Sequence, residues 1–372
     1  MSSKPIKIVI SGGGTGGHIF PAIAIADAMR SRFPDCKLLF VGALGRMEMQ
    51  KVPQAGYEIK GLWISGFQRN LSYRNLSFPF KLILSMVRAW LILKRFNPDV
   101  VIGVGGYASG PTLRAAISLK IPTLIQEQNS FPGVTNRVLG KKVNTICVAY
   151  DHMETWFPKE RTVLTGNPLR KTAVDIAGKK SEALKFFGLS PDKPVLLVVG
   201  GSQGAHSINK AIGAHLKDLV IAGIQLIWQT GESYFHRAVI QVEHDAMQET
   251  IKPHVFINRM DLAYAAATLI VSRAGAIAIS EIAVVGKPAI FVPLPTASEN
   301  HQMKNALRLS EDGAALVVEN MHAEKQLIKE VTSLITDTKR LELMSAKLER
   351  FAITDAADRI ANEITSLLKH EH

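Results

Sequence analysis

Two glycine-rich stretches decide how this chain of 372 residues folds. They read KIVISGGGTGGH at residues 7–18 and LVVGGSQGAH at residues 197–206. At a constant offset, positions 12, 13, 16 and 18 of the first match positions 200, 201, 204 and 206 of the second. In both, an apolar run leads into a glycine turn and a helical pattern, as at the start of a dinucleotide-binding βα unit. Such turns are common, but their place at the start of each half favours two copies of one architecture.

Short apolar runs alternate with helical patterns along the rest of the chain. The predicted strands cover residues 7–11, 38–42, 100–104, 123–126, 145–148 and 163–166, then 195–200, 225–229, 254–257, 269–272 and 289–293. Helical patterns between them include residues 21–33, 207–222 and 276–285. This alternation is typical of parallel sheets covered by helices on both faces. We therefore predict an α/β protein of two doubly wound, Rossmann-like domains, with a boundary near residues 166–168, where Gly and Pro interrupt the pattern.

Length and composition restrict the class of protein. The chain is long enough for two domains with their own cores, and 47% hydrophobic with 20% charged residues is typical of globular proteins. Its two cysteines, Cys36 and Cys147, can form neither a disulfide scaffold nor a CxxC metal site, which favours a reducing compartment. Residues 1–11 contain no signal-peptide core, and no apolar run reaches the ~18 residues needed to span a bilayer. A secreted, integral membrane or fibrous protein is not expected.

Positive charge is concentrated in the first half of the chain. Residues 1–168 hold 21 Lys and Arg against 9 Asp and Glu, whereas residues 169–372 hold 23 of each, so the whole net charge of +12 lies in the first half. A basic half indicates a polyanionic partner such as nucleic acid, a phosphorylated substrate or anionic lipid, although a merely soluble basic surface gives the same count. No basic patch is interleaved with stacking aromatic residues, so nucleic acid is not an expected partner.

Residues 78–96 form an unusually apolar helical pattern. Lys81, Arg88 and Arg95 recur every seven residues and make one narrow basic stripe, while nearly all the remaining circumference is apolar, Trp90 included. Such a helix either contacts an anionic membrane through these residues or is a buried core helix whose basic side chains reach solvent. We favour membrane contact and leave the core helix as the alternative.

The glycine loops suggest a phosphate-bearing ligand but not a nicotinamide cofactor. Residues 12–17 satisfy GxGxxG, yet the second strand is followed by no acid before Glu48, where an acid should bind the ribose of NAD. A third glycine cluster, residues 103–111, also follows a strand. Three such loops at strand ends would line a crevice between the domains and present backbone N–H groups to a ligand, unless they are only tight turns. Since Asp-x-Asp, HExxH and P-loop Lys motifs are absent, we expect no metal or cofactor, and a diphosphate would be neutralised by helix ends, Ser and Arg.

Several polar residues follow the predicted strands. His18 would begin a helix, where the helix dipole keeps its imidazole neutral and suited to act as a general base. Glu127 and Asn129 follow a strand, and Arg170 beyond the boundary can reach a phosphate bidentately. Glu281, in the first turns of a helix, can accept hydrogen bonds from two vicinal hydroxyls, as a ribose presents. Each has an ordinary alternative: a capping His, loop polarity, a solvated Arg or a carboxylate at a helix dipole.

The motifs together resemble a known family. They are GGTGGH at 13–18, GGY at 105–107, QEQN at 126–129, GNPLR at 166–170, GGSQGA at 200–205, RAGA at 273–276, SE at 280–281 and HQ at 301–302. Their order and spacing resemble the MurG family of bacterial N-acetylglucosaminyltransferases over nearly the whole chain, to about residue 310. The resemblance implies a GT-B fold with an interdomain cleft: a membrane-facing acceptor domain at residues 1–167 and a UDP-sugar-binding domain at residues 168–355. In such folds the last helix, here about residues 356–370, often returns to the first domain.

The resemblance also implies an activity. The donor would be UDP-N-acetylglucosamine and the acceptor undecaprenyl-pyrophosphoryl-N-acetylmuramoyl-pentapeptide (lipid I). The muramoyl C4 hydroxyl would attack the anomeric carbon with inversion, UDP would leave, and lipid II for peptidoglycan would form. The protein would lie peripherally on the cytoplasmic face of the bacterial inner membrane. Other cell-wall synthesis and division proteins would be its partners, which links it to cell shape, cell division and the cell cycle.

Site residues follow from the same resemblance. His18 is the predicted base, with Glu127 as its partner or rival. The implied donor-site positions are Thr15, Gly16, Gly17, Asn129, Arg170, Ser202, Ile257, Ala276, Ile277, Ala278, Ile279, Ser280, Glu281 and Gln302. Glu281 would bind the ribose, the backbone of Ile257 the uracil, and Thr15 and Ser202 would approach the diphosphate.

Two positions depart from the family pattern, and two other functions remain open. Ala278 stands where the family commonly has Thr or Ser, and Gln126 replaces a frequent His. One alternative function is a related glycolipid glycosyltransferase with another acceptor, such as diacylglycerol. The other is a membrane-adsorbed protein that binds nucleotide sugars without turnover, against which the presence of both His18 and Glu281 argues.

Overall fold

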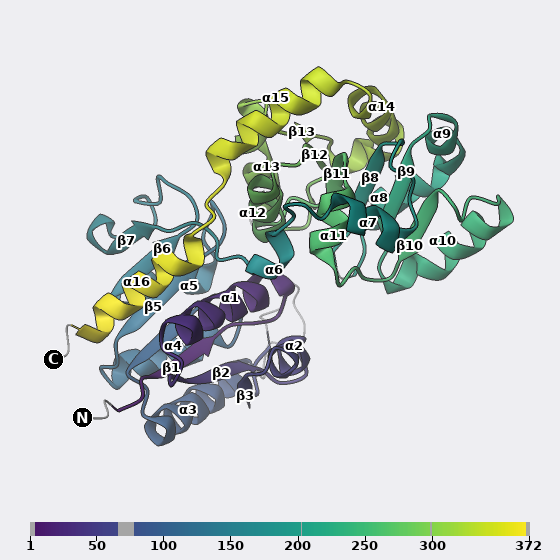
Figure 1. Ribbon diagram of the computed structural model, residues 1–372. Helices are drawn as coiled ribbons and strands as arrows, with labels where there is room; N and C mark the ends of the chain where they lie inside the picture. The colour runs from purple at the N-terminus through teal and green to yellow at the C-terminus, as the bar shows by residue number, and fades with distance from the viewer. Residues whose placement is uncertain (1–3, 66–77, 202, 298–299, 370–372) are drawn as a thin grey trace. The chain divides into compact units, whose positions relative to one another are not determined.

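A computed structural model describes residues 4–65, 78–201, 203–297 and 300–369. The chain forms two compact units. The first unit comprises Met1–Arg170 together with Asp355–His372, and the second unit comprises Lys171–Thr354. Figure 1 shows the helices and strands of both units.

The first unit is built on a parallel sheet. Its strands are β1 (Lys7–Ser11), β2 (Lys37–Ala43), β3 (Glu58–Leu62), β4 (Val100–Gly103), β5 (Thr123–Glu127), β6 (Thr145–Val148) and β7 (Thr162–Leu164), in the order β3-β2-β1-β4-β5-β6-β7. Its helices are α1 (Gly16–Arg32), α2 (Glu48–Gln54), α3 (Phe78–Phe96), α4 (Ser109–Ser118), α5 (Val134–Gly140), α16 (Ala356–Lys369) and the 3-10 turn η2 (Lys159–Arg161). The order reverses between β1 and β4, and open α/β sheets bind ligands beyond the strand ends at such a point.

The second unit repeats this plan. Its parallel strands are β8 (Val195–Val199), β9 (Gln225–Gln229), β10 (Ile251–His254), β11 (Leu269–Ser272), β12 (Ala289–Phe291) and β13 (Leu316–Val317), in the order β10-β9-β8-β11-β12-β13. The helices are α6 (Lys171–Val174), α7 (Lys180–Phe187), α8 (His206–Ala214), α9 (Leu216–Ile221), α10 (Glu232–His244), α11 (Met260–Ala266), α12 (Ala276–Val285), α13 (His301–Glu311), α14 (Ala323–Ile335) and α15 (Thr338–Leu348), with the turns η4 (Asn320–His322) and η5 (Glu349–Phe351). The reversal here lies between β8 and β11.

Helices cover both faces of each sheet. In the first unit, α3, α4 and α5 pack on one face and α1 and α16 on the other. Helix α16 lies along α1 (Figure 1) and buries Ile360, Ala361 and Ile364 in the same core cluster as Ile8 and Ile10 of β1. Strands covered on both sides are apolar on both sides, which explains the unbroken apolar runs in the sequence. The predicted architecture of two Rossmann-like, doubly wound domains is confirmed.

The edges of the sheets were predicted least well. The strand expected at residues 254–257 is β10, three residues earlier, and it contains Pro253. Because β10 is an edge strand, the missing N–H of this proline is tolerated. Edge strand β3 was not predicted, since Glu58 and Lys60 alternate with its apolar residues, and β13 has only two residues.

Two helices also differ from the prediction. Helix α1 begins at Gly16, more than one turn before Pro21, which therefore lies inside the helix. The helix expected over residues 207–222 is two helices, α8 and α9, which meet at His215. Because proline favours a helix start, the helical pattern was assigned from residue 21, although His18 was itself expected at the start of a helix, as the structure has it.

Candidate active site

Two glycine loops meet at the sheet reversal of the first unit. One follows β1 and the other follows β4. Gly13, Gly14 and Gly106 have φ values of 148°, 91° and 83°, which favour glycine. A Cβ on Gly106 would lie 2.1 Å from the carbonyl oxygen of Gly13, so the two loops pack backbone against backbone.

Glu48 holds the first of these loops in place. Its side chain is 1% exposed, and its Oε2 accepts a hydrogen bond from Gly14 N at 2.8 Å. Its Oε1 accepts another from Ala43 N at 2.9 Å. The first acid after β2 therefore shapes the glycine loop, a role that the sequence pattern did not reveal.

His18 lies in the first turn of α1, half-buried beside the second loop. Its Nδ1 is 3.0 Å from Oε1 of Gln128, which follows β5. Burial lowers the pKa of His18 below its usual 6.5, partly offset by the negative charge of Glu127 and the hydrogen bond to Gln128. The imidazole is therefore neutral at pH 7 and able to accept a proton.

This lowered pKa predicts the acid limb of the activity profile. If neutral His18 is the active form, kcat/KM is expected to decline about tenfold per pH unit below the pKa of His18, with a midpoint under 6.5. Burial disfavours the imidazolium and therefore lowers the pKa of His18. The active neutral form thus persists to a lower pH than in a free histidine. Initial rates from pH 5 to 9 at low substrate check this, and a midpoint above 7 would contradict it.

Glu127, the other predicted catalytic residue, organises the loop after β5. Its side chain is 2% exposed. Oε1 accepts hydrogen bonds from Asn129 N (3.0 Å) and Asn129 Nδ2 (3.2 Å), while Oε2 accepts from Gly133 N (3.1 Å) and Asn136 Nδ2 (2.9 Å). Four donors thus direct this carboxylate toward residues 129–136. The arrangement favours His18 over Glu127 as the base, and it orients Asn129.

The remaining predicted residues of the first unit surround the start of α1. Thr15 is the N-cap, exposed and extended, and its carbonyl accepts from His18 N at 3.1 Å. Gly16 and Gly17 are the first two helical residues, whose N–H groups have no partner within the helix. The Arg170 guanidinium stacks 4.3 Å from the ring centroid of Phe20, and its Nε is buried without a hydrogen-bond partner among the described residues. The unpaired N–H groups at the start of α1 and the guanidinium on the Phe20 ring are both sources of positive potential.

In the second unit, Gln229 ties together two predicted regions. Its Nε2 donates to Gly201 O at 3.0 Å in the loop after β8. Its Oε1 accepts from Ile257 N, also at 3.0 Å. The N–H of Ile257 is thus used within the protein, and sequence reasoning had not singled out Gln229. Ser202, predicted at the same loop, lies outside the described residues.

Helix α12 carries most of the predicted donor residues. It follows β11, and its N-cap Gly275 is extended. The side chains of Ala276 and Ile279 are buried, so these residues can meet a ligand only through their backbone. The N–H groups of residues 276–278 begin the helix, while Ile279 N already donates to Gly275 O. Ile277, Ala278 and Ser280 are half-buried.

Glu281 is positioned by a buried tyrosine. Tyr264 in α11 is 2% exposed, and its hydroxyl donates to Oε2 of Glu281 at 2.8 Å. Burial, followed by the charge of Glu281, raises the pKa of Tyr264, which keeps it a donor. Gln302, at the start of α13, accepts from Leu294 N through Oε1 at 2.9 Å. The tyrosine was not predicted, because it precedes Glu281 by 17 residues on another helix.

Arg273 acts as an internal support of this region. Its Nη1 donates to Val292 O (2.9 Å) and Asn320 Oδ1 (2.7 Å), and its Nη2 donates to Ser207 Oγ (3.1 Å). Burial lowers its pKa to about 10. The guanidinium thereby joins the start of α8 to the end of β12.

Replacing Arg273 with methionine is expected to destabilise the second unit by about 2 kcal/mol, because several buried acceptors lose a charged donor. In a unit of this size that lowers the unfolding temperature by about 4–8 °C. Differential scanning calorimetry measures this, with Arg340→Met on exposed α15 as the control. Equal unfolding temperatures for both variants would show that Arg273 is not a support.

The described part of the chain holds no group of three or more His, Cys, Asp and Glu side chains arranged to bind a metal ion. In the same residues, no helix combines the length and apolarity that crossing a bilayer requires.

Comparison with known proteins identifies the class. The glycosyltransferase family 28 N-terminal domain matches residues 8–148, and the family 28 C-terminal domain matches residues 195–360. The chain therefore belongs to glycosyltransferase family 28, with the GT-B fold.

Similar proteins indicate which kind of family 28 glycosyltransferase this chain resembles. A protein of Cytophaga hutchinsonii named UDP-N-acetylglucosamine--N-acetylmuramyl-(pentapeptide) pyrophosphoryl-undecaprenol N-acetylglucosamine transferase is 52% identical over 365 residues, covering 98% of each chain. The protein of the same name from Porphyromonas gingivalis is 50% identical over 372 residues, covering 100% of this chain and 98% of the other. The crystal structure of Acinetobacter baumannii MurG is 30% identical with a TM-score of 0.77, covering 97% and 100%. The predicted resemblance to the MurG family is confirmed.

Proposed function

We propose that this hexosyltransferase transfers N-acetylglucosamine from UDP-N-acetylglucosamine to the C4 hydroxyl of the muramoyl residue of lipid I, with inversion. The observation that carries the proposal is the neutral, half-buried His18 at the start of α1, held by Gln128 beside two glycine loops. His18 removes the proton of the attacking hydroxyl, and UDP leaves from the anomeric carbon. The close relatives named for this reaction support the substrates.

The second unit binds the donor. Glu281, held by Tyr264, accepts hydrogen bonds from the two ribose hydroxyls. The backbone carbonyl of Ile257 contacts the uracil, since its N–H is directed to Gln229. The start of α12 faces the diphosphate with its N–H groups, and the dipole of the helix stabilises the departing charge. Ala278 contributes no hydroxyl there, so this stabilisation depends on the backbone.

Residues of the first unit complete the proposed chemistry. In this proposal Thr15, Gly16 and Gly17 supply N–H and hydroxyl groups suited to a phosphate, and the Arg170 guanidinium supplies a positive charge. Asn129, oriented by Glu127, contacts the transferred sugar.

Alanine at position 281 is expected to weaken UDP-N-acetylglucosamine binding by about 10- to 100-fold, because hydrogen bonds to a charged acceptor contribute about 1.5–3 kcal/mol. Turnover of bound substrate changes less. Titration calorimetry with UDP measures the loss, with Glu342→Ala on exposed α15 as the control. Tyr264→Phe gives a smaller loss in the same direction. Unchanged affinity in Glu281→Ala would remove the ribose assignment.

The reaction itself is tested by UDP release. Purified protein is incubated with UDP-N-acetylglucosamine, with and without a soluble lipid I analogue. Release that depends on the acceptor, and is lost with UDP-N-acetylgalactosamine, supports the proposed donor and acceptor together. Release only with another acceptor such as diacylglycerol would favour a different glycolipid transferase. UDP binding without release under any condition would favour a protein that binds nucleotide sugars without turnover.

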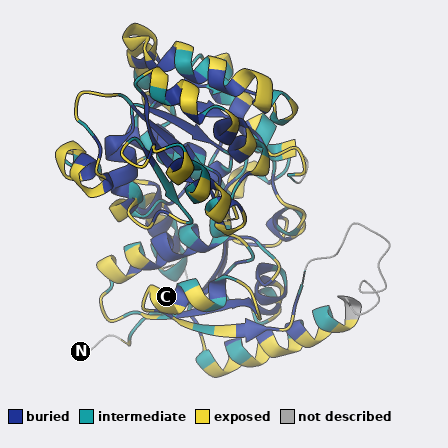
Figure 2. Cartoon of the chain, turned by 90° about the vertical axis from the view of Figure 1, so that its right-hand side faces the viewer, coloured by how far each residue is buried: buried dark blue, intermediate teal, exposed yellow. Residues whose placement is uncertain are grey.

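Helix α3 is the proposed membrane contact. One face of α3 is in the core, where Ser85, Ala89 and Leu93 are at most 1% exposed. The opposite face of α3 carries six large apolar residues that are between 40% (Trp90) and 72% (Phe80) exposed. Figure 2 shows exposed positions along this helix in yellow. The six residues are Phe80, Ile83, Leu84, Val87, Trp90 and Leu91. The outward apolar stripe, unusual for a protein surface, supports contact with lipid over a buried core helix.

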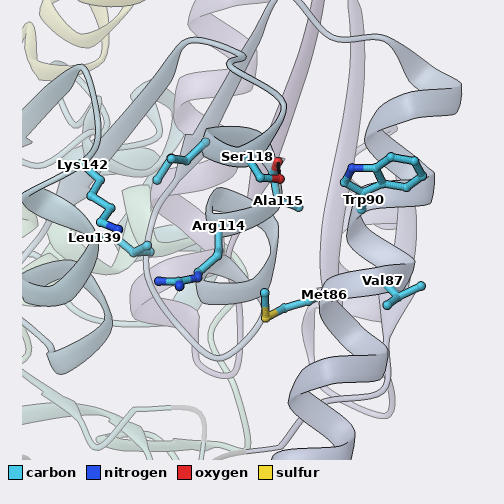
Figure 3. A pocket seen from close by; sticks show the side chains of 9 residues that line it. Met86, Val87, Trp90, Arg114, Ala115, Ser118, Leu139 and Lys142 are labelled. Atoms are coloured by element: carbon cyan, nitrogen blue, oxygen red, sulfur yellow. Dashed lines mark hydrogen bonds between the residues drawn. The ribbon is translucent and has the colours of Figure 1, made fainter.

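Basic groups flank this apolar stripe. Arg88 and Arg95 are exposed, and Lys81 is half-buried with its ammonium 5.3 Å from the Trp63 ring centroid. A pocket of about 420 Å³ lies beside the stripe, between α3, α4 and α5 (Figure 3). Its lining is mostly apolar, with Trp90 on one side and the cations Arg114 and Lys142 on the other. An apolar lining with two cations suits the acyl chain and phosphate of an anionic lipid.

The proposed location follows from this contact and the acceptor. The protein lies peripherally on the cytoplasmic face of the bacterial inner membrane, where UDP-sugars and lipid I are both available. Proteins of cell-wall synthesis and division are proposed partners on the same surface.

A further inference from the structure

We propose that Gln128 is a positioning residue, which holds His18 in the tautomer that carries its proton on Nδ1 and leaves Nε2 as the proton-accepting nitrogen. The inference rests on the proposed function only for the use made of that nitrogen. The tautomer itself follows from hydrogen-bond directions in a buried network of three side-chain amides.

The direction of the Gln128 amide is set by main-chain carbonyls. A carbonyl oxygen can only accept, so the group facing it must be the NH2 end of the amide. Nε2 of Gln128 lies 2.8 Å from Val104 O and 3.3 Å from Gln126 O. Oε1 of Gln128 therefore lies on the other side of the amide, 3.0 Å from Nδ1 of His18.

A second anchor gives the same direction independently. Nδ2 of Asn167 donates to Gln128 O at 3.1 Å, which turns Oδ1 of Asn167 toward Nε2 of Gln126, also at 3.1 Å. Oε1 of Gln126 then accepts a hydrogen bond from Nε2 of Gln128. All three amides are buried, at most 3% exposed, so reversing any of them would place two acceptors or two donors together away from water.

The consequence for His18 is chemical. An amide oxygen is only an acceptor, so Nδ1 of His18 must be the donor. A neutral imidazole has a single N–H, which leaves the lone pair on Nε2. Free histidine favours the opposite tautomer, which carries its proton on Nε2. In that tautomer Nε2 has no lone pair with which to accept the proton of a hydroxyl. The amide of Gln128 that orients the ring is also uncharged. A carboxylate in its place would strongly favour the imidazolium, whereas the amide does not.

The decisive measurement needs no variant. Protein labelled with 15N-histidine is examined near pH 8, and the His18 signals among the eleven histidines are assigned by their loss in His18→Gln. We expect the shift of a protonated nitrogen at Nδ1 and of an unprotonated nitrogen at Nε2. A protonated Nε2 in the unaltered protein would overturn the proposal, whatever its transfer activity.

Variants then test Gln128 itself. Gln128→Met, which has similar volume but no amide, is expected to shift His18 toward the Nε2–H tautomer and lower kcat 10- to 100-fold, with KM for UDP-N-acetylglucosamine changed less than threefold. Gln241→Met removes a comparable amide in α10, which donates to Gly213 O, and should leave the His18 signals unchanged. Retention of the Nδ1–H tautomer in folded Gln128→Met would overturn the positioning role. If the tautomer is as proposed and His18→Gln still transfers sugar at full rate, the proposed base fails and the tautomer assignment stands.

Discussion

Turnover is expected to fall about 10²- to 10⁴-fold when His18 is replaced by alanine, the range that a general base contributes. The imidazole lies at the start of α1 with its Nδ1 directed to Gln128. The alanine variant lacks the group that removes the proton, but it keeps all the groups of the second unit that are assigned to the nucleotide. Affinity for UDP should therefore change less than threefold.

Steady-state UDP release and calorimetry with UDP separate the two effects. His236→Ala, at an exposed position of α10, is the matched control and should retain full turnover. Unchanged turnover in His18→Ala would exclude His18 as the base. An equal loss of turnover and UDP affinity would assign it to donor binding instead. If turnover is unchanged in His18→Ala, Glu127→Gln is the next variant to examine, because the Glu127 carboxylate is the alternative candidate for the base.

Charge reversal of α3 is the second large effect. Glutamate at positions 81, 88 and 95 is expected to reduce adsorption to vesicles containing anionic phospholipid more than about 100-fold, since each basic residue near such a surface contributes about 1 kcal/mol. Adsorption of the unaltered protein should weaken as salt rises. Turnover on a soluble acceptor analogue should be retained, because α3 contributes nothing to the proposed site. Sedimentation with vesicles of defined composition measures the partition.

A variant of equal charge provides the comparison. Lys325→Glu, Lys329→Glu and Lys339→Glu together change the net charge by the same amount at exposed positions of the second unit. This variant should adsorb nearly as well as the unaltered protein. Equal weakening in both would mean that only overall charge matters. Undiminished adsorption of the α3 variant would exclude the helix as a membrane contact, leaving its apolar stripe to a second copy or a protein partner.

The fold could be predicted from the sequence because buried parallel strands are apolar on both faces. The glycine loops after β1 and β8 marked the two reversal points, since tight βα turns restrict which residues can occupy them. Edge strands escaped prediction, because a strand such as β3 is half exposed and its charged residues hide the apolar pattern. The start of α1 was displaced because Pro21 is tolerated inside this helix.

The predicted site residues lie in sequence motifs, and they stay predictions of function, whereas the residues that position them were not predicted. His18 directly follows the glycine loop at the start of α1, and Glu281 lies in the second turn of α12, which begins after Gly275, so a linear pattern can point to both. A linear pattern does not reveal the partners of these residues, because Gln128 is 110 residues away from His18 and Tyr264 is 17 residues away from Glu281. Such contacts exist only once the strands are ordered, because they depend on which side chains the fold brings within 3 Å.

Helix α16 has a consequence for the order in which the chain folds during synthesis. The first unit takes its core from both ends of the sequence, with Ile360 and Ile364 packed beside β1. The second unit is one continuous segment that ends at Thr354. Domains fold as units while they leave the ribosome, usually from the N-terminus onward. Here the second unit can complete its core before the first unit does, because the first unit keeps an uncovered apolar face until α16 has been synthesised.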